Sequence, residues 1–425
     1  MNNRRKFLEQ AAWSAFGVTV LSGCSEPKKT DAVADATSES ADTPATSKDG
    51  FGSAKRIIFI NVKGGMSHID TFDPKKGNGP GDILSTKADF QVTNYLEKTA
   101  KIANQISLIR SMTAKVGVHG PAQYFMRTAF TERNTIKHPN LGAWAQHFLG
   151  PSHDTLPSSA CINQGPRYGN GFFAPAFSPI PILDPQTGLE NIKSKTRPIE
   201  LKRNLDLASQ LSAGFLEKFQ DSNVSAYRDF YDQTMRMLRS KDLDAFDLSK
   251  EDKQTRERYG DSRFGQGCLL ARRLVETGIR FVEVTSDGWD MHKDLKGEMD
   301  DICPPFDHAY AALIADLKER GLLDTTLVVL ATEFGRKPKY EGDGRGHYPL
   351  CFTVGLAGAG VKRGFVYGGS DATGAEAEQP VTVGDFHATI GWAAGLPIDR
   401  EVVTSSGRPF KIGGNKAKPI LEMFA

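Results

Sequence analysis

Apolar runs alternate with amphipathic segments along most of this 425-residue chain. The run RIIFINV at residues 56–62 is continuous, rich in β-branched and aromatic residues, and ends at two glycines, which is typical of a buried strand. More strands are predicted by ISLIRSM, IRFVEVTS, TTLVVLATE and PLCFTVGLA, and helices by NYLEKTAKIANQ, HGPAQYFMRTAF, NLGAWAQHFLG, GQGCLLARRLVETG and HAYAALIADLKERGLL. Since strands alternate with helices, we predict an α/β fold in which helices sandwich a mainly parallel sheet.

One long stretch interrupts this alternation. Residues 151–198 are dense in Pro and Gly, which predicts irregular loops, and residues 201–260 are charged and favour helix. We therefore expect one α/β domain over residues 55–425 that carries a loop and helical insertion at about residues 151–260. A chain of this length can bury an ample core.

The first 24 residues indicate an export signal. Arg4 and Arg5 precede Lys-Phe-Leu and a short apolar stretch, a pattern typical of twin-arginine signals. The following Leu-Ser-Gly-Cys resembles a bacterial lipobox, so Cys24 is the predicted site of lipidation; an ordinary amphipathic helix is the alternative. Residues 25–54 are rich in Ser, Thr, Ala, Asp and Pro, which predicts a disordered tether. We expect an exported protein that a lipid anchors to the membrane of the cell envelope, on the periplasmic or outer face.

Composition narrows the possible partners. The formal net charge of +2, without a block of Lys or Arg, gives no case for a nucleic-acid partner. The cysteines beyond the signal are widely spaced and form no Cys-x-x-Cys motif, which argues against a cysteine zinc cluster. In an oxidising compartment, one or two disulfides among them remain possible. The sequence leaves the oligomeric state open.

Histidines and carboxylates follow four of the predicted strands. In an open parallel sheet, ligands bind beyond the carboxyl ends of the strands, so these residues should meet at one edge. The predicted metal ligands are His68, Asp70, Asp73, His119, Asp290, His292, Glu333 and His347. Mixed imidazole and carboxylate ligands suit Zn, Mn or Fe, and oxygen ligands suit Ca, so we predict a divalent metal ion of one of these kinds. Arg336 and Arg345 are predicted to clamp an oxyanion beside it.

Some of these candidates have a structural alternative. Asp73 precedes Pro74, which favours a turn residue, so His68 and Asp70 rank above it. His119 precedes Gly-Pro and could cap a helix instead. Asp290 and His292 of the GWDMH motif are the hardest to explain as turn or cap residues, and we rank them first among the candidate metal ligands.

Several longer motifs carry a family resemblance. They include GGMSHIDTFDPK, HPNLGAWAQHFLG, RERYGDSRFGQGCLLARRLVETGIRFVEV, GWDMH, TEFGRKP and GRGHYP, in this order along the chain. Together they resemble bacterial exported proteins of the domain of unknown function 1501 (DUF1501), from about residue 56 to nearly the C-terminus. This family in turn resembles the alkaline phosphatase and sulfatase superfamily. The resemblance implies a doubly wound, alkaline phosphatase-like α/β sandwich with a metal site at the carboxyl edge of its sheet.

The resemblance also implies roles for individual residues. It implies a first-strand acidic ligand at Asp70 or Asp73, a middle pair at Asp290 and His292, a late acidic ligand at Glu333 and a final ligand at His347. A Thr, Ser or modified Cys nucleophile would follow the second strand, where Ser111 and Thr113 are the nearest hydroxyls, although neither lies in a matching motif. The sulfatase signature Cys-x-Pro-x-Arg is absent from the sequence, and Gly346 in GRGHYP stands where related sequences tend to carry Asp. The resemblance therefore implies the fold, whereas the catalytic chemistry is a separate inference that rests on analogy.

Two functions fit these observations. The first is a metal-dependent hydrolase outside the cytoplasm that acts on a phosphate or sulfate ester of an anionic small molecule or polysaccharide. Metal-bound hydroxide would be its nucleophile if no side chain serves. The second is a non-catalytic lipoprotein that keeps the fold as a binding module, for instance for anionic polysaccharide. Metal content separates the two, because the hydrolase requires stoichiometric metal.

Overall fold

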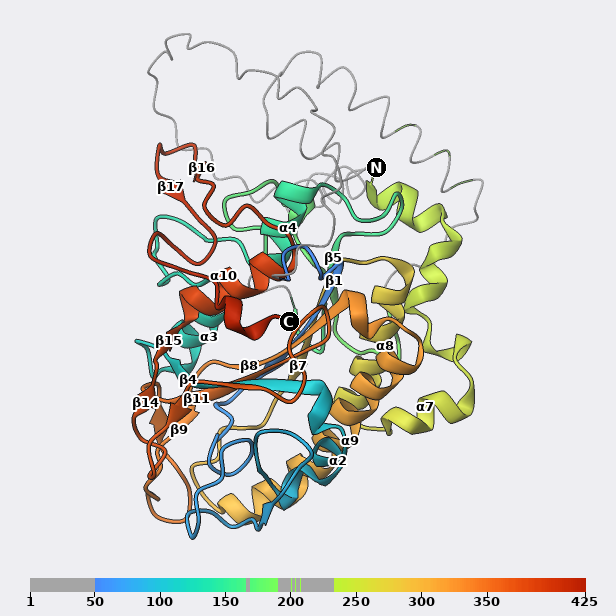
Figure 1. Cartoon of the computed structure of the whole chain (residues 1–425). Coiled ribbons are helices and arrows are strands. Elements are labelled where there is room, and N and C mark those ends of the chain that lie inside the picture. Colours follow the sequence, from blue (N-terminus) through green and yellow to red (C-terminus); the bar gives the residue numbers. More distant parts are fainter. Residues whose placement is uncertain (1–49, 166–168, 190–199, 201–202, 204–206, 208–232) are drawn as a thin grey trace, which may run out of the picture. The chain divides into compact units, whose positions relative to one another are not determined.

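The computed structural model describes residues 50–165, 169–189, 200, 203, 207 and 233–425 (Figure 1). The predicted signal peptide with Cys24, nearly all of the predicted tether and part of the predicted insertion lie outside these residues. Within the described part of the chain, no helix is both long enough and apolar enough to span a membrane.

Nine of the described strands form a central sheet (Figure 1). They are β1 (Arg56–Val62), β4 (Ile106–Thr113), β5 (Ser159–Ile162), β6 (Ile180–Ile182), β7 (Phe281–Ser286), β8 (Thr326–Thr332), β11 (Phe352–Ala357), β12 (Val366–Tyr367) and β15 (Val381–Thr382). The order is β12-β4-β11-β8-β1-β7-β5-β6, and β15 pairs with β4. These strands run parallel to their neighbours, except that β11 is antiparallel to both β4 and β8. The predicted mainly parallel sheet is confirmed.

Helices cover both faces of this sheet (Figure 1). On one face lie α2 (Glu97–Lys101), α7 (Lys253–Tyr259), α8 (Arg263–Thr277) and α9 (Leu295–Glu319), and on the other α3 (His119–Thr128), α4 (Leu141–Leu149) and α10 (Val383–Ala393). Within β1, Ile58 and Ile60 belong to the core that contains α8 and α9, whereas Ile57 and Phe59 belong to the core that contains α4 and α10. Alternate side chains of one strand thus enter two separate cores, and the doubly wound α/β fold is confirmed.

Short elements occupy the connections. Two-residue strands pair as β2 (Ile83–Leu84) with β3 (Val92–Thr93), β9 (Gly335–Arg336) with β10 (His347–Tyr348), β13 (Gly369–Ser370) with β14 (Ala377–Glu378), and β16 (Val402–Val403) with β17 (Pro409–Phe410). The 3-10 helices are η1 (Asn94–Leu96), η2 (Ala103–Gln105), η3 (Pro175–Phe177), η4 (Lys241–Phe246), η5 (Leu248–Lys250), η6 (Leu323–Thr325) and η7 (Leu421–Met423). The Pro- and Gly-rich stretch that predicts irregular loops contributes β5 and β6, because its short apolar runs SACI and IPI extend the sheet beside β7.

The long helix α9 begins earlier than its apolar pattern predicts. The side chain of Asp294 caps the helix by accepting a hydrogen bond from the main-chain N–H of Gly297 at 3.2 Å. The helix then continues through Pro304 and Pro305, although prolines inside a helix normally interrupt it. The adjoining Phe306 is buried in the core, so packing of the apolar face outweighs this local preference.

The four described cysteines are Cys161, Cys268, Cys303 and Cys351. All four are buried and free, so none of these described residues forms the disulfides that the sequence left possible. They pack as small apolar side chains in the domain.

The segments that contain the predicted site residues lie at one edge of the sheet. β1, β4, β7 and β8 share one direction and end at this edge, whereas β11 runs the opposite way and begins there. The segments that follow the first four strands therefore meet the segment that precedes β11. His347 reaches the edge by this second route, since it lies before β11.

Candidate metal centre

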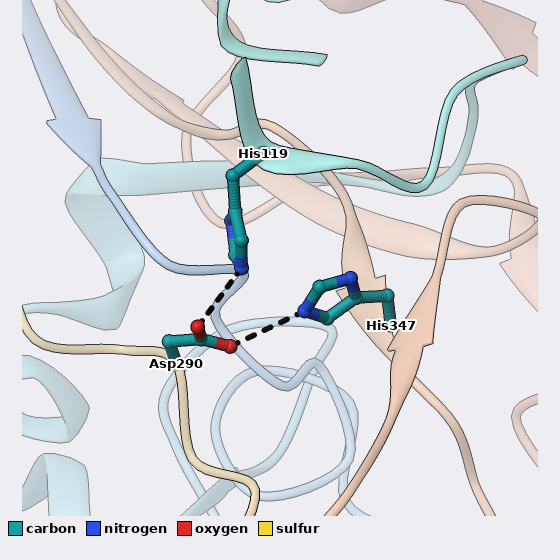
Figure 2. A group of neighbouring side chains, drawn as sticks. All are labelled: His119, Asp290 and His347. Atoms are coloured by element: carbon teal, nitrogen blue, oxygen red, sulfur yellow. Dashed lines mark hydrogen bonds and ion pairs between the residues drawn. The ribbon is translucent and has the colours of Figure 1, made fainter. Parts of the chain in front are cut away.

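Two histidines and an aspartate lie together beyond this edge (Figure 2). His119 is the first residue of α3, Asp290 follows β7, and His347 begins β10. Nε2 of His119 lies 3.0 Å from Oδ2 of Asp290, and Nε2 of His347 lies 3.3 Å from Oδ1 of the same carboxylate. One potential ligand atom from each residue lies within 4.8 Å of the others. These three residues, called here the His-Asp-His group, form a possible metal site.

The second ring nitrogen of each histidine is already engaged. Nδ1 of His119 lies 2.8 Å from Oε1 of Glu333, and Nδ1 of His347 lies 2.8 Å from the carbonyl oxygen of Gly117. Carboxylate and carbonyl oxygens accept hydrogen bonds, so each Nδ1 carries a proton. A neutral ring then turns its Nε2 lone pair toward the carboxylate of Asp290. Such an arrangement requires a cation between the ring and the carboxylate, either a proton on Nε2 or a metal ion.

Arg336 holds the carboxylate of the group in place. Its buried guanidinium donates a hydrogen bond through Nη2 to Oδ1 of Asp290. Partial burial raises the pKa of Asp290, but the hydrogen bond and charge of Arg336 outweigh it and hold this pKa well below its usual range. Asp290 is therefore ionised near neutral pH, as a carboxylate ligand to a metal ion must be.

The other donors of Arg336 bind the main chain. Nε donates to the carbonyl oxygen of Gly65 at 2.9 Å, Nη1 donates to that of Arg345 at 2.8 Å, and Nη2 also contacts that of Gly64. The sequence predicted that Arg336 clamps an oxyanion, whereas in the structure its donors bind the protein itself. Arg336 thus connects the turn after β1 to Asp290.

Glu333 is the buried partner that orients His119. Its side chain is 0% exposed, and besides His119 its Oε1 accepts hydrogen bonds from the main-chain N–H of Gly64 at 3.0 Å and from Nε2 of Gln123 at 3.3 Å. Sequence reasoning missed Gln123. The signal that could have found it is the i, i+4 spacing in HGPAQ, which places it on the same face of α3 as His119. The main-chain carbonyl that engages His347 has no sequence signal.

His292 lies at the exposed rim of the group. Its Nε2 is 3.0 Å from Oδ1 of Asp290 and 3.0 Å from Nε2 of His347, and its side chain is 47% exposed. Desolvation and the nearby charge of Arg336 lower the pKa of His292. A neutral imidazole in this position can bind a metal ion or exchange a proton with solvent.

Asp70 and Arg345, both predicted as site residues, bind each other. Nε of Arg345 lies 2.7 Å from Oδ2 of Asp70, and Nη2 lies 3.0 Å from Oδ1, in a bidentate ion pair whose side chains are both 0% exposed. Nη2 also donates to Oδ1 of Asn78 at 3.1 Å, and Nη1 donates to the carbonyl oxygens of Lys337 and Pro338. The pair therefore fixes the loops around the site, and its charges are compensated within the protein.

His68 and Asp73 also have partners of their own. Nε2 of the buried His68 donates to the carbonyl oxygen of Gly374 at 2.8 Å, and burial lowers its pKa. The buried carboxylate of Asp73 lies 3.2 Å from Nζ of Lys75 and 3.3 Å from Nη1 of Arg110. Both residues hold segments next to the His-Asp-His group rather than joining it.

The two candidate nucleophiles are engaged at the edge of the sheet. The hydroxyl of Ser111 donates to the carbonyl oxygen of Gln379 at 2.7 Å, and that of Thr113 donates to the carbonyl oxygen of Val381 at 3.2 Å. The two hydroxyls thus connect β4 to the first residue of β15 and to the chain just before it.

A close approach of main chain to main chain shapes the turn after β1. Gly64 has φ of +125°, and a Cβ atom at this position would lie 2.5 Å from the main-chain nitrogen of Asp290. A side chain is excluded there, so glycine lets the turn pack directly against the segment that carries Asp290.

Residues 54–424 match the family described as Protein of unknown function (DUF1501). The chain belongs to this family. No curated protein matches the sequence of this DUF1501 protein.

Several solved structures are distantly similar to this family member. The lipoteichoic acid synthase LtaP of Listeria monocytogenes is 10% identical, with 88% of this chain and 78% of that chain covered and a TM-score of 0.41. The PsFucS1 sulfatase of Pseudoalteromonas sp. is 10% identical, with 81% and 68% covered and a TM-score of 0.40. The phosphonate monoester hydrolase SpPMH of Silicibacter pomeroyi is 11% identical, with 87% and 77% covered and a TM-score of 0.34. Likeness at this level carries no inference about the activity of the DUF1501 protein.

Proposed function

We propose that this DUF1501 protein is a metal-dependent hydrolase of phosphate or sulfate esters, in which His119, Asp290 and His347 hold a divalent ion. The observation that carries the proposal is the orientation of the two histidines, each of which donates its Nδ1 proton to a protein acceptor and turns Nε2 toward Asp290. Hydrogen bonds of this kind are typical of metal-ligating histidines. The motif resemblance to the alkaline phosphatase and sulfatase superfamily supports an anionic ester as the substrate.

The ligand set suits the chemistry. Two imidazoles and one carboxylate suit Zn, Mn or Fe and leave a coordination position open. When bound, such an ion polarises a phosphoryl or sulfuryl oxygen or lowers the pKa of a bound water. Arg336 keeps Asp290 ionised, and Glu333 holds His119 with Nε2 directed at the group.

His292 supports a proton-transfer step at the same place. Its ring contacts both Asp290 and His347 and is half exposed, so it can exchange protons with solvent. We assign to the neutral ring of His292 the acceptance of a proton from the attacking water.

Metal content and activity test this proposal. The purified full chain is expected to contain about one metal ion per His-Asp-His group by plasma mass spectrometry, and Asp290→Ala and His347→Ala are expected to lose it. A matched control is His308→Ala on α9, which should keep its metal. Metal-loaded protein is then assayed on p-nitrophenyl phosphate, bis(p-nitrophenyl) phosphate and p-nitrophenyl sulfate. Failure to hydrolyse any of the three would contradict the hydrolase.

A non-catalytic binding module is the second candidate. It is favoured by the engagement of the hydroxyls of Ser111 and Thr113 with main-chain carbonyl oxygens, which leaves no candidate side-chain nucleophile from the sequence. Protein that contains no metal as purified and keeps its melting temperature in chelator would support this candidate over the hydrolase.

Export and lipid anchoring remain proposals from the sequence. We expect Cys24→Ala to move the protein from the membrane fraction to the soluble envelope fraction, and Arg4→Lys with Arg5→Lys to retain it in the cytoplasm. Membrane association that is unchanged in Cys24→Ala would contradict the lipid anchor.

A further inference from the structure

A cleft of about 670 Å³ opens at the surface beside the β9–β10 hairpin. This volume lies within the roughly 300–1,000 Å³ of small-molecule sites. Its lining includes Tyr340, Tyr348, Lys337 and Lys339, and none of its described lining residues is acidic. The cleft is therefore both aromatic and cationic.

Tyr340 offers a fixed aromatic surface in this cleft. The guanidinium carbon of Arg345 lies 4.4 Å from the centroid of the Tyr340 ring. Arg345 is itself held by its bidentate ion pair with Asp70. The tyrosine nevertheless remains 38% exposed. One side of its ring thus contacts a buried cation, and its exposed part lines the cleft.

Asn78 and Lys339 add a hydrogen-bond donor and a positive charge to the cleft. Oδ1 of Asn78 accepts a hydrogen bond from Nη2 of Arg345, and because a guanidinium can only donate, the amide nitrogen of Asn78 remains as a donor at the cleft. Lys337 pairs with Glu341, whereas Lys339 is exposed and forms no ion pair with any described residue. Its ammonium is available to an anionic ligand.

The cleft and the His-Asp-His group lie on opposite faces of one hairpin. In its register His347 pairs with Arg336, and Tyr348 pairs with Gly335. Successive residues of a strand point to opposite faces, so the side chain of Tyr348 points away from that of His347. Its hydroxyl donates to the carbonyl oxygen of Ala375 at 3.0 Å, which holds the ring at the cleft. The cleft is therefore separate from the candidate metal centre.

We propose that this cleft binds an anionic saccharide, with a sugar ring stacked on Tyr340 and a sulfate, phosphate or carboxylate group at Lys339. The C–H face of a pyranose ring is apolar and complements the face of an aromatic ring. Sugar hydroxyls accept hydrogen bonds from the amide of Asn78, and the ammonium of Lys339 pairs with the anion. The site binds its ligand whether or not the metal centre is catalytic.

Binding of dextran sulfate to the full chain, measured by isothermal titration calorimetry, tests this site against neutral dextran and inorganic polyphosphate. Tyr340→Ala and Lys339→Gln are each expected to weaken dextran sulfate binding by about tenfold. Tyr340→Phe keeps the ring and should keep the affinity. The matched control Lys416→Gln removes an exposed lysine elsewhere and should have no effect.

Asp290→Ala separates this proposal from the hydrolase, because it should abolish metal binding and leave dextran sulfate binding unchanged. The saccharide site is overturned if Tyr340→Ala binds dextran sulfate as tightly as the parent, or if Lys416→Gln weakens binding as much as Lys339→Gln. It is also overturned if polyphosphate binds as tightly as dextran sulfate, since charge alone would then account for the binding.

Discussion

Nδ1 of His119 lies 2.8 Å from Oε1 of Glu333, a contact between residues 214 positions apart in the sequence. The same oxygen accepts hydrogen bonds from the main chain of Gly64 and the side chain of Gln123. Glu333 thus joins the turn after β1 to the first turn of α3. Its effect on a metal ion would be indirect, through the direction in which His119 presents Nε2.

Replacing Glu333 with glutamine removes the charge that orients His119 at nearly constant volume. Since outer partners of metal ligands contribute about 10–100-fold to affinity, Glu333→Gln should weaken Zn²⁺ binding by that factor, as measured by competition with a chromophoric chelator. Glu319→Gln removes an exposed glutamate that pairs with Arg258 and serves as the control. Equal Zn²⁺ affinities for the two variants would contradict a role of Glu333 in supporting the metal site.

Breaking the buried pair of Asp70 and Arg345 should be costly. Asp70→Asn leaves a guanidinium that is 0% exposed without its countercharge, so we expect the free energy of unfolding in urea to fall by about 3–5 kcal/mol. Asp287→Asn breaks an exposed pair with Lys63 and should cost less than about 1 kcal/mol. If Asp70 is structural, folded Asp70→Asn keeps its metal content; loss of metal from folded protein would make Asp70 a ligand.

Substitution at Gly64 tests the close approach that shapes the turn after β1. A Cβ atom there would lie 2.5 Å from the main-chain nitrogen of Asp290, at a φ of +125°, so Gly64→Ala should destabilise the protein by about 2–5 kcal/mol. Gly77 also has a positive φ of +73°, but a Cβ atom there would meet nothing within 4 Å. Gly77→Ala should therefore cost only about 1 kcal/mol in the same urea titration. Similar costs at both positions would reject the steric account.

The buried His387 should make stability depend on pH. Burial lowers its pKa from an ordinary value of 6.5 to about 4, while Nε2 donates to the carbonyl oxygen of Met126 at 2.7 Å. Between these two values the unfolded chain binds a proton that the folded protein does not, so stability is complete above pH 6.5 and falls as the pH falls toward 4. The loss between pH 7 and pH 5 is about 2 kcal/mol for this residue.

The variant His387→Gln isolates this contribution, because it keeps a side-chain donor and does not titrate. The difference in unfolding free energy between pH 7 and pH 5 should shrink by about 2 kcal/mol relative to the parent. An undiminished difference would assign the pH dependence to other groups.

The sequence predicts the five longest strands of the central sheet, which are β1, β4, β7, β8 and β11, because each is a continuous apolar run. The observed β1 coincides with the predicted run at residues 56–62, and the predicted order of helices and strands places His119, Asp290 and His347 at one edge. Sequence position could not separate these residues from Asp70, which follows β1 in the same way. The distinction depends on a partner 275 residues away, Arg345, and pairing at that separation leaves no local pattern.

Short strands and the start of α9 were predicted less well, because local sequence carries little signal for them. The two-residue strands β12 and β15 carry too few residues for a periodic signal. The helix at Pro304 and Pro305 contradicts the local preference of proline. Tertiary packing decides both cases.

The chain between β8 and β11 leaves the sheet and returns to it at the same edge, because these two strands are antiparallel. One continuous segment, residues 333–351, therefore supplies both the glutamate that orients His119 and the histidine of the His-Asp-His group. Its tip bends between Glu341 and Gly344, away from the paired ends. The segment is a natural unit for transplantation: exchanging residues 337–340, which line the cleft beside the hairpin, between family members would vary what that cleft binds without disturbing the register of the sheet.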